Sequence, residues 1–273
     1  MNDEWCAAAP GHYIPLMLIP LWDPVLAAKE IERMADKGVR AMAFSENPSP
    51  LGLPDIHDPN GYWDPVWATC NDTGVIVCMH IGLSSVMPKV SDNAPFVANM
   101  ARGASRTAGT MLAWLFSGLF PRFPNLKISL AEGNIGWIPY FLERAEYVWE
   151  RQRYWNERGQ SFTAQTADGK AHGQLATDFD YEVFDIRQTY LDYVYGCFLD
   201  DKAGLKMIDE VGENNIMVET DYPHSDTTWP DSQKLMNDRV AAVGLSDEQI
   251  HKVLRGNAER SFQFTPAAIP TEF

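Results

Sequence analysis

Long apolar runs are missing from this sequence of 273 residues. No segment approaches the roughly 20 consecutive apolar residues that a transmembrane helix needs. The best candidate, residues 14–22, is too short and carries two prolines. Asp3 and Glu4 precede this segment without any basic residue, a pattern unlike that of a secretory signal. We therefore expect a protein with no membrane span and no membrane partner.

Basic residues and cysteines are also scarce. Lys and Arg number 22 against 37 Asp and Glu, which gives a formal net charge of −15. Because a negative field repels phosphate, nucleic acid and anionic membrane surfaces are not expected as partners. The four cysteines are scattered and form no C-x-x-C pair, which is typical of reduced thiols in a cytoplasmic protein.

Several catalytic signatures do not occur. The sequence has no Gly-rich phosphate loop, no dinucleotide fingerprint and no H-E-x-x-H motif. The nearest match to the nucleophile elbow G-x-S-x-G, at residues 82–86, fails at its last position. Nucleotide-binding proteins and serine hydrolases therefore lack support.

What the sequence does contain is an alternation of strand and helix patterns. Apolar runs predict six strands, at residues 13–21, 39–44, 75–81, 126–131, 190–198 and 216–220. Helices are predicted at residues 24–37, 64–73, 95–120 (with breaks near Gly103 and Gly109), 137–155 and 201–211, and two more after the N-caps Asp231 and Ser246. Strands joined by helices imply a parallel sheet in an α/β fold, either doubly wound or a (β/α)₈ barrel.

The chain is interpreted as one domain over residues 1–273. Only residues 156–180 interrupt the alternation, because they are polar and rich in glycine. A loop of this length inside a compact domain is predicted to be an insertion or a lid.

Three ionisable residues stand where predicted strands end. His80 closes the run VIVCMH, Glu132 closes KISLAE, and Asp221 closes IMVETD. Parallel strands present their carboxyl ends on one face, where α/β enzymes gather their chemistry. An imidazole with two carboxylates is a plausible ligand set for Zn²⁺ or Mn²⁺. The sequence therefore predicts a divalent metal site made of these three residues.

Each of these residues taken alone also suits a structural role. His80 could be a core histidine bonded to backbone, Glu132 could pair with a basic residue, and Asp221 could be a turn residue. The recurrence of one pattern on three strands is what favours the metal site.

Four segments carry a family resemblance. They are VCMHIG at residues 77–82, LKISLAEGNIGWIP at 126–139, ETDYPH at 219–224 and GNA at 256–258. In them the sequence resembles the amidohydrolase-related (amidohydrolase 2) family of metal-dependent TIM-barrel hydrolases and decarboxylases. The resemblance implies a (β/α)₈ barrel in which His80 binds the metal and Asp221 is both ligand and general base. Glu132 replaces a family histidine, so it is expected to be a ligand that favours Mn²⁺ or an acid/base beside the metal.

The resemblance also implies that the barrel is incomplete. Members of the family begin with a strand that carries H-x-H or an acidic-x-H pair, and none precedes residue 14 here. By the family's layout the six strands are strands three to eight, with the first two βα units missing. The chain would then be either an N-terminally truncated form or a divergent member. Sheet edges would then be exposed, and we expect a homo-oligomer to cover them.

The predicted function is metal-dependent hydrolysis of a small organic substrate. Asp221 and Glu132 are the expected catalytic residues, and His224 and Trp229 are expected to bind substrate. Tyr62 and Trp63 are candidates for the pocket wall, although aromatic residues more often simply pack in the core. Two alternatives stay open: a non-oxidative decarboxylase on the same barrel, and a catalytically silent remnant that acts as a binding module.

Overall fold

Six parallel strands form a single sheet. The computed structural model describes residues 2–86, 89–156, 180 and 182–268. The strands are β1 (Leu16–Met17), β2 (Ala41–Ser45), β3 (Ile76–His80), β4 (Ile128–Ala131), β5 (Val194–Phe198) and β6 (Ile216–Val218). Each pairs in parallel with the next along the chain. This arrangement confirms the predicted α/β class, and the predicted insertion at residues 156–180 lies almost wholly outside the described residues.

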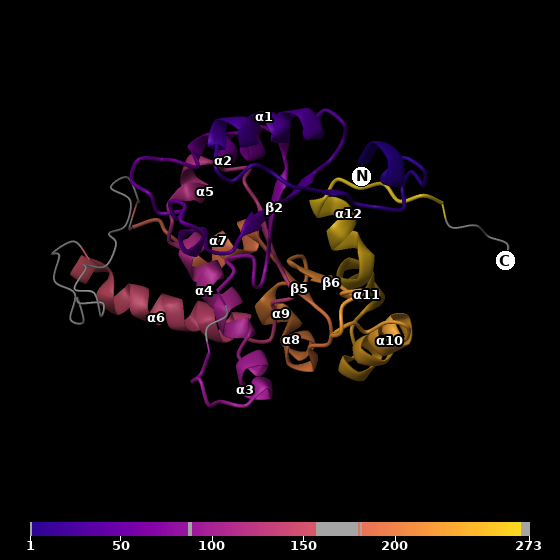
Figure 1. Ribbon diagram of the computed structural model, residues 1–273. Helices are drawn as coiled ribbons and strands as arrows, with labels where there is room; N and C mark the ends of the chain where they lie inside the picture. The colour runs from indigo at the N-terminus through magenta and orange to yellow at the C-terminus, as the bar shows by residue number, and fades with distance from the viewer. Residues whose placement is uncertain (1, 87–88, 157–179, 181, 269–273) are drawn as a thin grey trace.

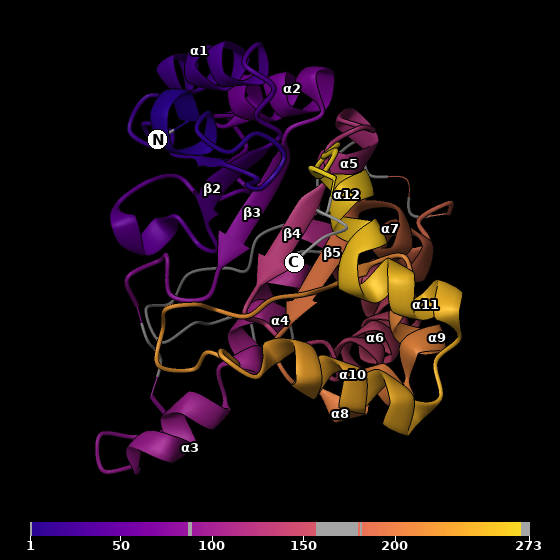
Figure 2. The ribbon, with the colours of Figure 1, turned by 90° about the vertical axis from the view of Figure 1, so that its right-hand side faces the viewer.

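Helices surround the twisted sheet (Figures 1 and 2). In chain order the α-helices are α1 (Pro24–Ala35), α2 (Asp64–Thr73), α3 (Phe96–Ala101), α4 (Ala104–Leu115), α5 (Leu119–Arg122), α6 (Ile138–Asn156), α7 (Ile186–Tyr193), α8 (Lys202–Lys206), α9 (Ile208–Val211), α10 (Ser232–Val243), α11 (Asp247–His251) and α12 (Asn257–Ser261). None of the helices in the described part of the chain is long and apolar enough to cross a bilayer.

Local signals set several helix ends as predicted. The Asp23 carboxylate accepts the N–H groups of Val25 and Leu26 at the start of α1, with Pro24 in the first helical position. Ser246 and Gln249 form the predicted capping box of α11. These contacts satisfy backbone donors that the first turn of a helix leaves unpaired.

Four boundary predictions were wrong. Gly109 lies inside α4, and the second break in residues 95–120 comes at Gly118, which has a φ of 71°. Residues 190–193 are the end of α7, so only residues 194–198 are strand. The first strand is confined to Leu16–Met17, because the prolines on either side of it cannot donate to a strand ladder. Residues 201–211 form two helices that meet at Met207.

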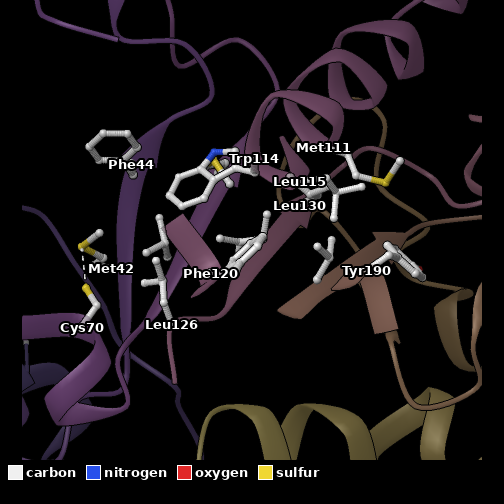
Figure 3. Close-up of a cluster of buried hydrophobic side chains, with 14 of the residues drawn as sticks. Met42, Phe44, Cys70, Met111, Trp114, Leu115, Phe120, Leu126, Leu130 and Tyr190 are labelled. Atoms are coloured by element: carbon white, nitrogen blue, oxygen red, sulfur yellow. Dashed lines mark hydrogen bonds between the residues drawn. The ribbon is translucent and has the colours of Figure 1, made fainter. Parts of the chain in front are cut away.

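The core lies between the sheet and the helices packed on it, including α1 and α6, and Figure 3 shows the part of it next to α2, α4, α5 and α7. Its aromatic rings pack edge to face: Trp67 and Trp114 have centroids 5.0 Å apart, and Phe44 meets Trp63 at 4.9 Å. Trp63 is almost fully buried in this cluster, which agrees with the packed alternative for this residue.

One edge of the sheet exposes apolar side chains. Leu18 and Trp22, beside the edge strand β1, are 79% and 75% exposed. The described residues hold six strands, whereas a complete barrel of this type has eight. That the six are strands three to eight of a barrel stays a prediction, as does the homo-oligomer expected to cover this edge.

Candidate metal centre

The carboxyl ends of neighbouring strands meet at one rim of the sheet. His80 is the last residue of β3, where it pairs with Ser45 of β2 on one side and Ala131 of β4 on the other. Glu132 is the first residue after β4, and Asp221 is the third after β6. The parallel register therefore brings all three predicted ligands to the same rim.

These three side chains also converge. One ligand atom each from His80, Glu132 and Asp221 lies within 4.8 Å of the other two. Neighbouring strands are about 4.8 Å apart, so in a flat sheet β3 and β6, three spacings apart, would be separated by roughly 14 Å. The sheet must therefore curve, as in a barrel, for these groups to meet.

His80 is held in one orientation by its own backbone neighbour. Its Nδ1 lies 2.6 Å from the Ile81 carbonyl oxygen. A carbonyl only accepts hydrogen bonds, so Nδ1 carries the proton and Nε2 faces Glu132 Oε1 at 2.7 Å. Burial lowers the pKa of His80, but the bond to Ile81 and the Glu132 carboxylate outweigh it, so the net pKa is raised. Nε2 is thereby presented to the centre, as metal-binding histidines require.

Glu132 and Asp221 are two acids in direct contact. Burial and then the hydrogen bond with Asp221 raise the pKa of Glu132, against the opposing effect of His80. Two carboxylates this close repel one another, and a bound cation would relieve that repulsion. Both residues have a φ of 53°, a left-handed conformation that costs roughly 1–2 kcal/mol for a residue with a Cβ. Backbone strain of this kind concentrates at functional sites.

A third acid, Glu219, lies beside the centre and was missed as a site residue from sequence. Its carboxylate accepts the backbone N–H of Glu132 at 2.8 Å. Burial raises the pKa of Glu219 to about 7, and the nearby Glu132 and Asp221 charges add to this shift. The available signal was its position two residues before Asp221, which puts it on the inward face of an extended segment.

Two further carboxylates hold the turns that follow the ligand-bearing strands. Glu46, after β2, accepts the Gly82 N–H at 3.0 Å and also pairs with Arg106 of α4. Asp201, after β5, accepts the N–H groups of Ile135 and Gly136 at 2.8 and 2.6 Å. Glu46 follows an apolar run as His80 and Glu132 do, so the same strand-end signal could have found it. These bonds fix the backbone on either side of the centre.

The predicted substrate-binding residues lie on the loop after β6. His224 Nδ1 is hydrogen-bonded to Asp221 Oδ2, and its ring is mostly exposed. Trp229 is also exposed and packs against Tyr222, with ring centroids 5.2 Å apart. His224 thus contacts the centre directly, whereas Trp229 shares only the loop, and its role in substrate binding stays a prediction. Peptide bonds Tyr222–Pro223 and Trp229–Pro230 are cis.

The donor set suits a divalent cation. It combines one imidazole nitrogen in the correct tautomer with two carboxyl groups in direct contact. Mixed nitrogen and oxygen donors fit Zn²⁺ and Mn²⁺. Because the three residues include no thiolate, the site does not favour softer metal ions.

A family comparison agrees with this geometry. A model of the family described as Amidohydrolase matches residues 1–264. The chain belongs to the amidohydrolase family. Because the match begins at the first residue, it gives no support to the expectation of a missing N-terminal part.

Several proteins similar to this chain are decarboxylases by name. A gamma-resorcylate decarboxylase from Polaromonas sp. is 29% identical over 150 residues, which are 53% of this chain and 45% of that protein. A gamma-resorcylate decarboxylase from Rhizobium sp. is 22% identical over 97% of this chain and 74% of its own length. The 5-carboxyvanillate decarboxylase of Novosphingobium aromaticivorans, solved with manganese and 4-hydroxy-3-methoxy-5-nitrobenzoic acid, is 18% identical, with a TM-score of 0.67 over 95% of this chain and 66% of that one. The chain thus spans less than half of the Polaromonas relative.

Proposed function

We propose that this amidohydrolase is a metal-dependent, non-oxidative decarboxylase of a hydroxylated aromatic carboxylate. The observation that carries the proposal is the convergence of His80, Glu132 and Asp221 within 4.8 Å at the rim of the sheet. The names of the relatives supply the reaction class, because they are decarboxylases of phenolic acids. A bound divalent cation, with Mn²⁺ the first candidate, would supply positive charge to hold the substrate's carboxylate and neighbouring phenol oxygen.

Asp221 is the proposed proton donor. Its carboxyl adds a proton to the ring carbon that bears the substrate carboxylate, and the bond from that carbon to the carboxylate then breaks. The electron pair of the broken bond restores the aromatic ring, and carbon dioxide leaves. Asp221 is nearly buried but hydrogen-bonded to the exposed His224, so His224 gives it a route for regaining a proton from solvent.

Glu132 has a supporting role in this proposal. It sits between His80 and Asp221, and its raised pKa shows how strongly the site disfavours two free negative charges. Its charge helps to hold the cation, and its contact with Asp221 keeps the two acids together at the centre.

The relatives favour the decarboxylase over hydrolysis, which was the first prediction from sequence. The two reactions differ in their products, so a direct test is possible. Purified protein is loaded with Mn²⁺ and given 2,6-dihydroxybenzoate, 5-carboxyvanillate, and the methyl ester of each. The decarboxylase releases carbon dioxide from the free acids, and in D₂O it places one deuterium at the vacated ring carbon. Release of methanol from the esters without carbon dioxide would establish the hydrolase instead.

A matched pair of variants tests the donor. Asp221→Asn is expected to lower the decarboxylation rate by at least about a hundredfold, the size of effect typical for a positioned acid. Asp226→Asn changes an exposed acid on the same loop and is expected to leave the rate unchanged. Manganese bound with no turnover of any of these compounds would favour the silent binding module.

A further inference from the structure

Glu219 makes a bond that crosses the sheet. It is the first residue after β6, and its Oε1 accepts the N–H of Glu132, the first residue after β4, at 2.8 Å. Strand β5 lies between these two strands. The bond therefore ties together two turns that the strand ladder does not join directly.

Both of these turns are conformationally demanding. Glu132 and Asp221 each have a φ of 53°, which residues with a Cβ rarely adopt unless the surroundings hold them there. The bond from Glu219 fixes the peptide that leads into Glu132. Glu219 is also only two residues before Asp221. Its side chain therefore helps to position both Glu132 and Asp221.

The acceptor position is set by the length of the side chain. Glu219 is mostly buried and approaches the Glu132 peptide from the end of β6, two strands away from β4. Aspartate, one methylene shorter, places its oxygen roughly 1.5 Å back along the side chain, beyond hydrogen-bond reach of that N–H. Glutamine keeps the length and still offers a carbonyl oxygen as acceptor, although it is neutral.

We propose that Glu219 is the positioning residue of the centre: its side-chain oxygen orients the Glu132 turn so that Glu132 meets His80 and Asp221. The proposal rests on the metal centre of the proposed function, and Glu219 itself touches neither cation nor substrate in it. Carboxylates that orient metal ligands in this way change metal affinity when they are removed.

The test measures Mn²⁺ affinity of the full chain, from the electron paramagnetic resonance signal of free Mn²⁺. Glu219→Asp is expected to weaken binding by about 10- to 100-fold, and Glu219→Gln by no more than about threefold. Asp185→Ala, which removes the N-cap of α7, is the control: it lowers the melting temperature without changing the affinity.

A second measurement needs no metal. Hydrogen exchange at the Glu132 amide in metal-free protein should accelerate in Glu219→Asp and stay slow in Glu219→Gln. Equal exchange and affinity in wild type and Glu219→Asp would overturn the proposal, and so would a Gln variant as weak as the Asp variant. A wild type that binds no Mn²⁺ refutes the proposed function, whereas the exchange result still decides whether Glu219 holds the turn.

Discussion

The ion pair between Glu46 and Arg106 gives the sharpest stability prediction. Glu46 Oε1 accepts hydrogen bonds from the Gly82 N–H at 3.0 Å, from Ser84 Oγ at 2.8 Å and from Arg106. The two charged side chains are only 7% and 11% exposed. Replacing one partner of a buried pair leaves the other charge uncompensated, which costs about 3–5 kcal/mol. We expect Glu46→Leu to lower the free energy of unfolding by about this amount.

The assay is urea denaturation followed by tryptophan fluorescence, with a surface pair as reference. Asp200 and Arg239 form a two-pronged ion pair whose side chains are 36% and 22% exposed, so solvent screens it. Asp200→Asn should shift the urea midpoint far less than Glu46→Leu does. The double variant Glu46→Leu with Arg106→Met should recover part of the loss, because neither charge then remains in the interior.

A Glu46→Leu midpoint close to that of Asp200→Asn would refute this reasoning. It would mean that water reaches the pair or that the turn at Gly82 rearranges without cost. A double variant less stable than Glu46→Leu would show that the Arg106 contacts outside this pair dominate.

Three further predictions concern the centre and the core. His80→Ala should lower Mn²⁺ affinity at least about tenfold; unchanged affinity would remove His80 from the site. In metal-free protein, native Glu219 holds a proton up to a pKa of about 7, whereas its ordinary value is 4.5. The native state therefore binds more protons than the unfolded state between those values, so stability should fall as pH rises from about 4.5 to 7, by up to roughly 3 kcal/mol. Glu219→Gln should flatten this part of the pH profile, measured by denaturation, and an equally steep profile would contradict it. Phe120→Ala should cost about 3–5 kcal/mol in the same assay, because Phe120 is fully buried and stacks on Tyr193 at 4.4 Å; a loss under about 1 kcal/mol would contradict it.

Helix starts and strand ends could be predicted from the sequence because their signals are local. Asp23 followed by Pro24 caps one helix, and Ser246 with Gln249 caps another, within a single turn in each case. Where local signals compete, prediction failed. Residues 190–193 are apolar enough for a strand, yet they complete a helix that the Asp185 side chain caps.

The candidate ligands could be predicted for a similar reason. A polar residue at the end of an apolar run in a parallel sheet must lie at the carboxyl rim, and this placed His80, Glu132 and Asp221 at one edge. Buried aromatic residues carry no such positional signal, so the sequence left open whether Trp63 packs in the core or lines a pocket.

The sequence by itself determined which strands exist and which residues end them, because caps and apolar periodicity act over a few residues. Only the tertiary structure decided that the imidazole and the two acids come within 4.8 Å of one another. That distance depends on the curvature of the whole sheet, to which every strand and packed helix contributes. The same holds for the hydrogen bonds that Glu219 and Glu46 accept from the backbone of the centre. Their partners are 87 and 36 residues away in the chain, so no local sequence pattern predicts these bonds.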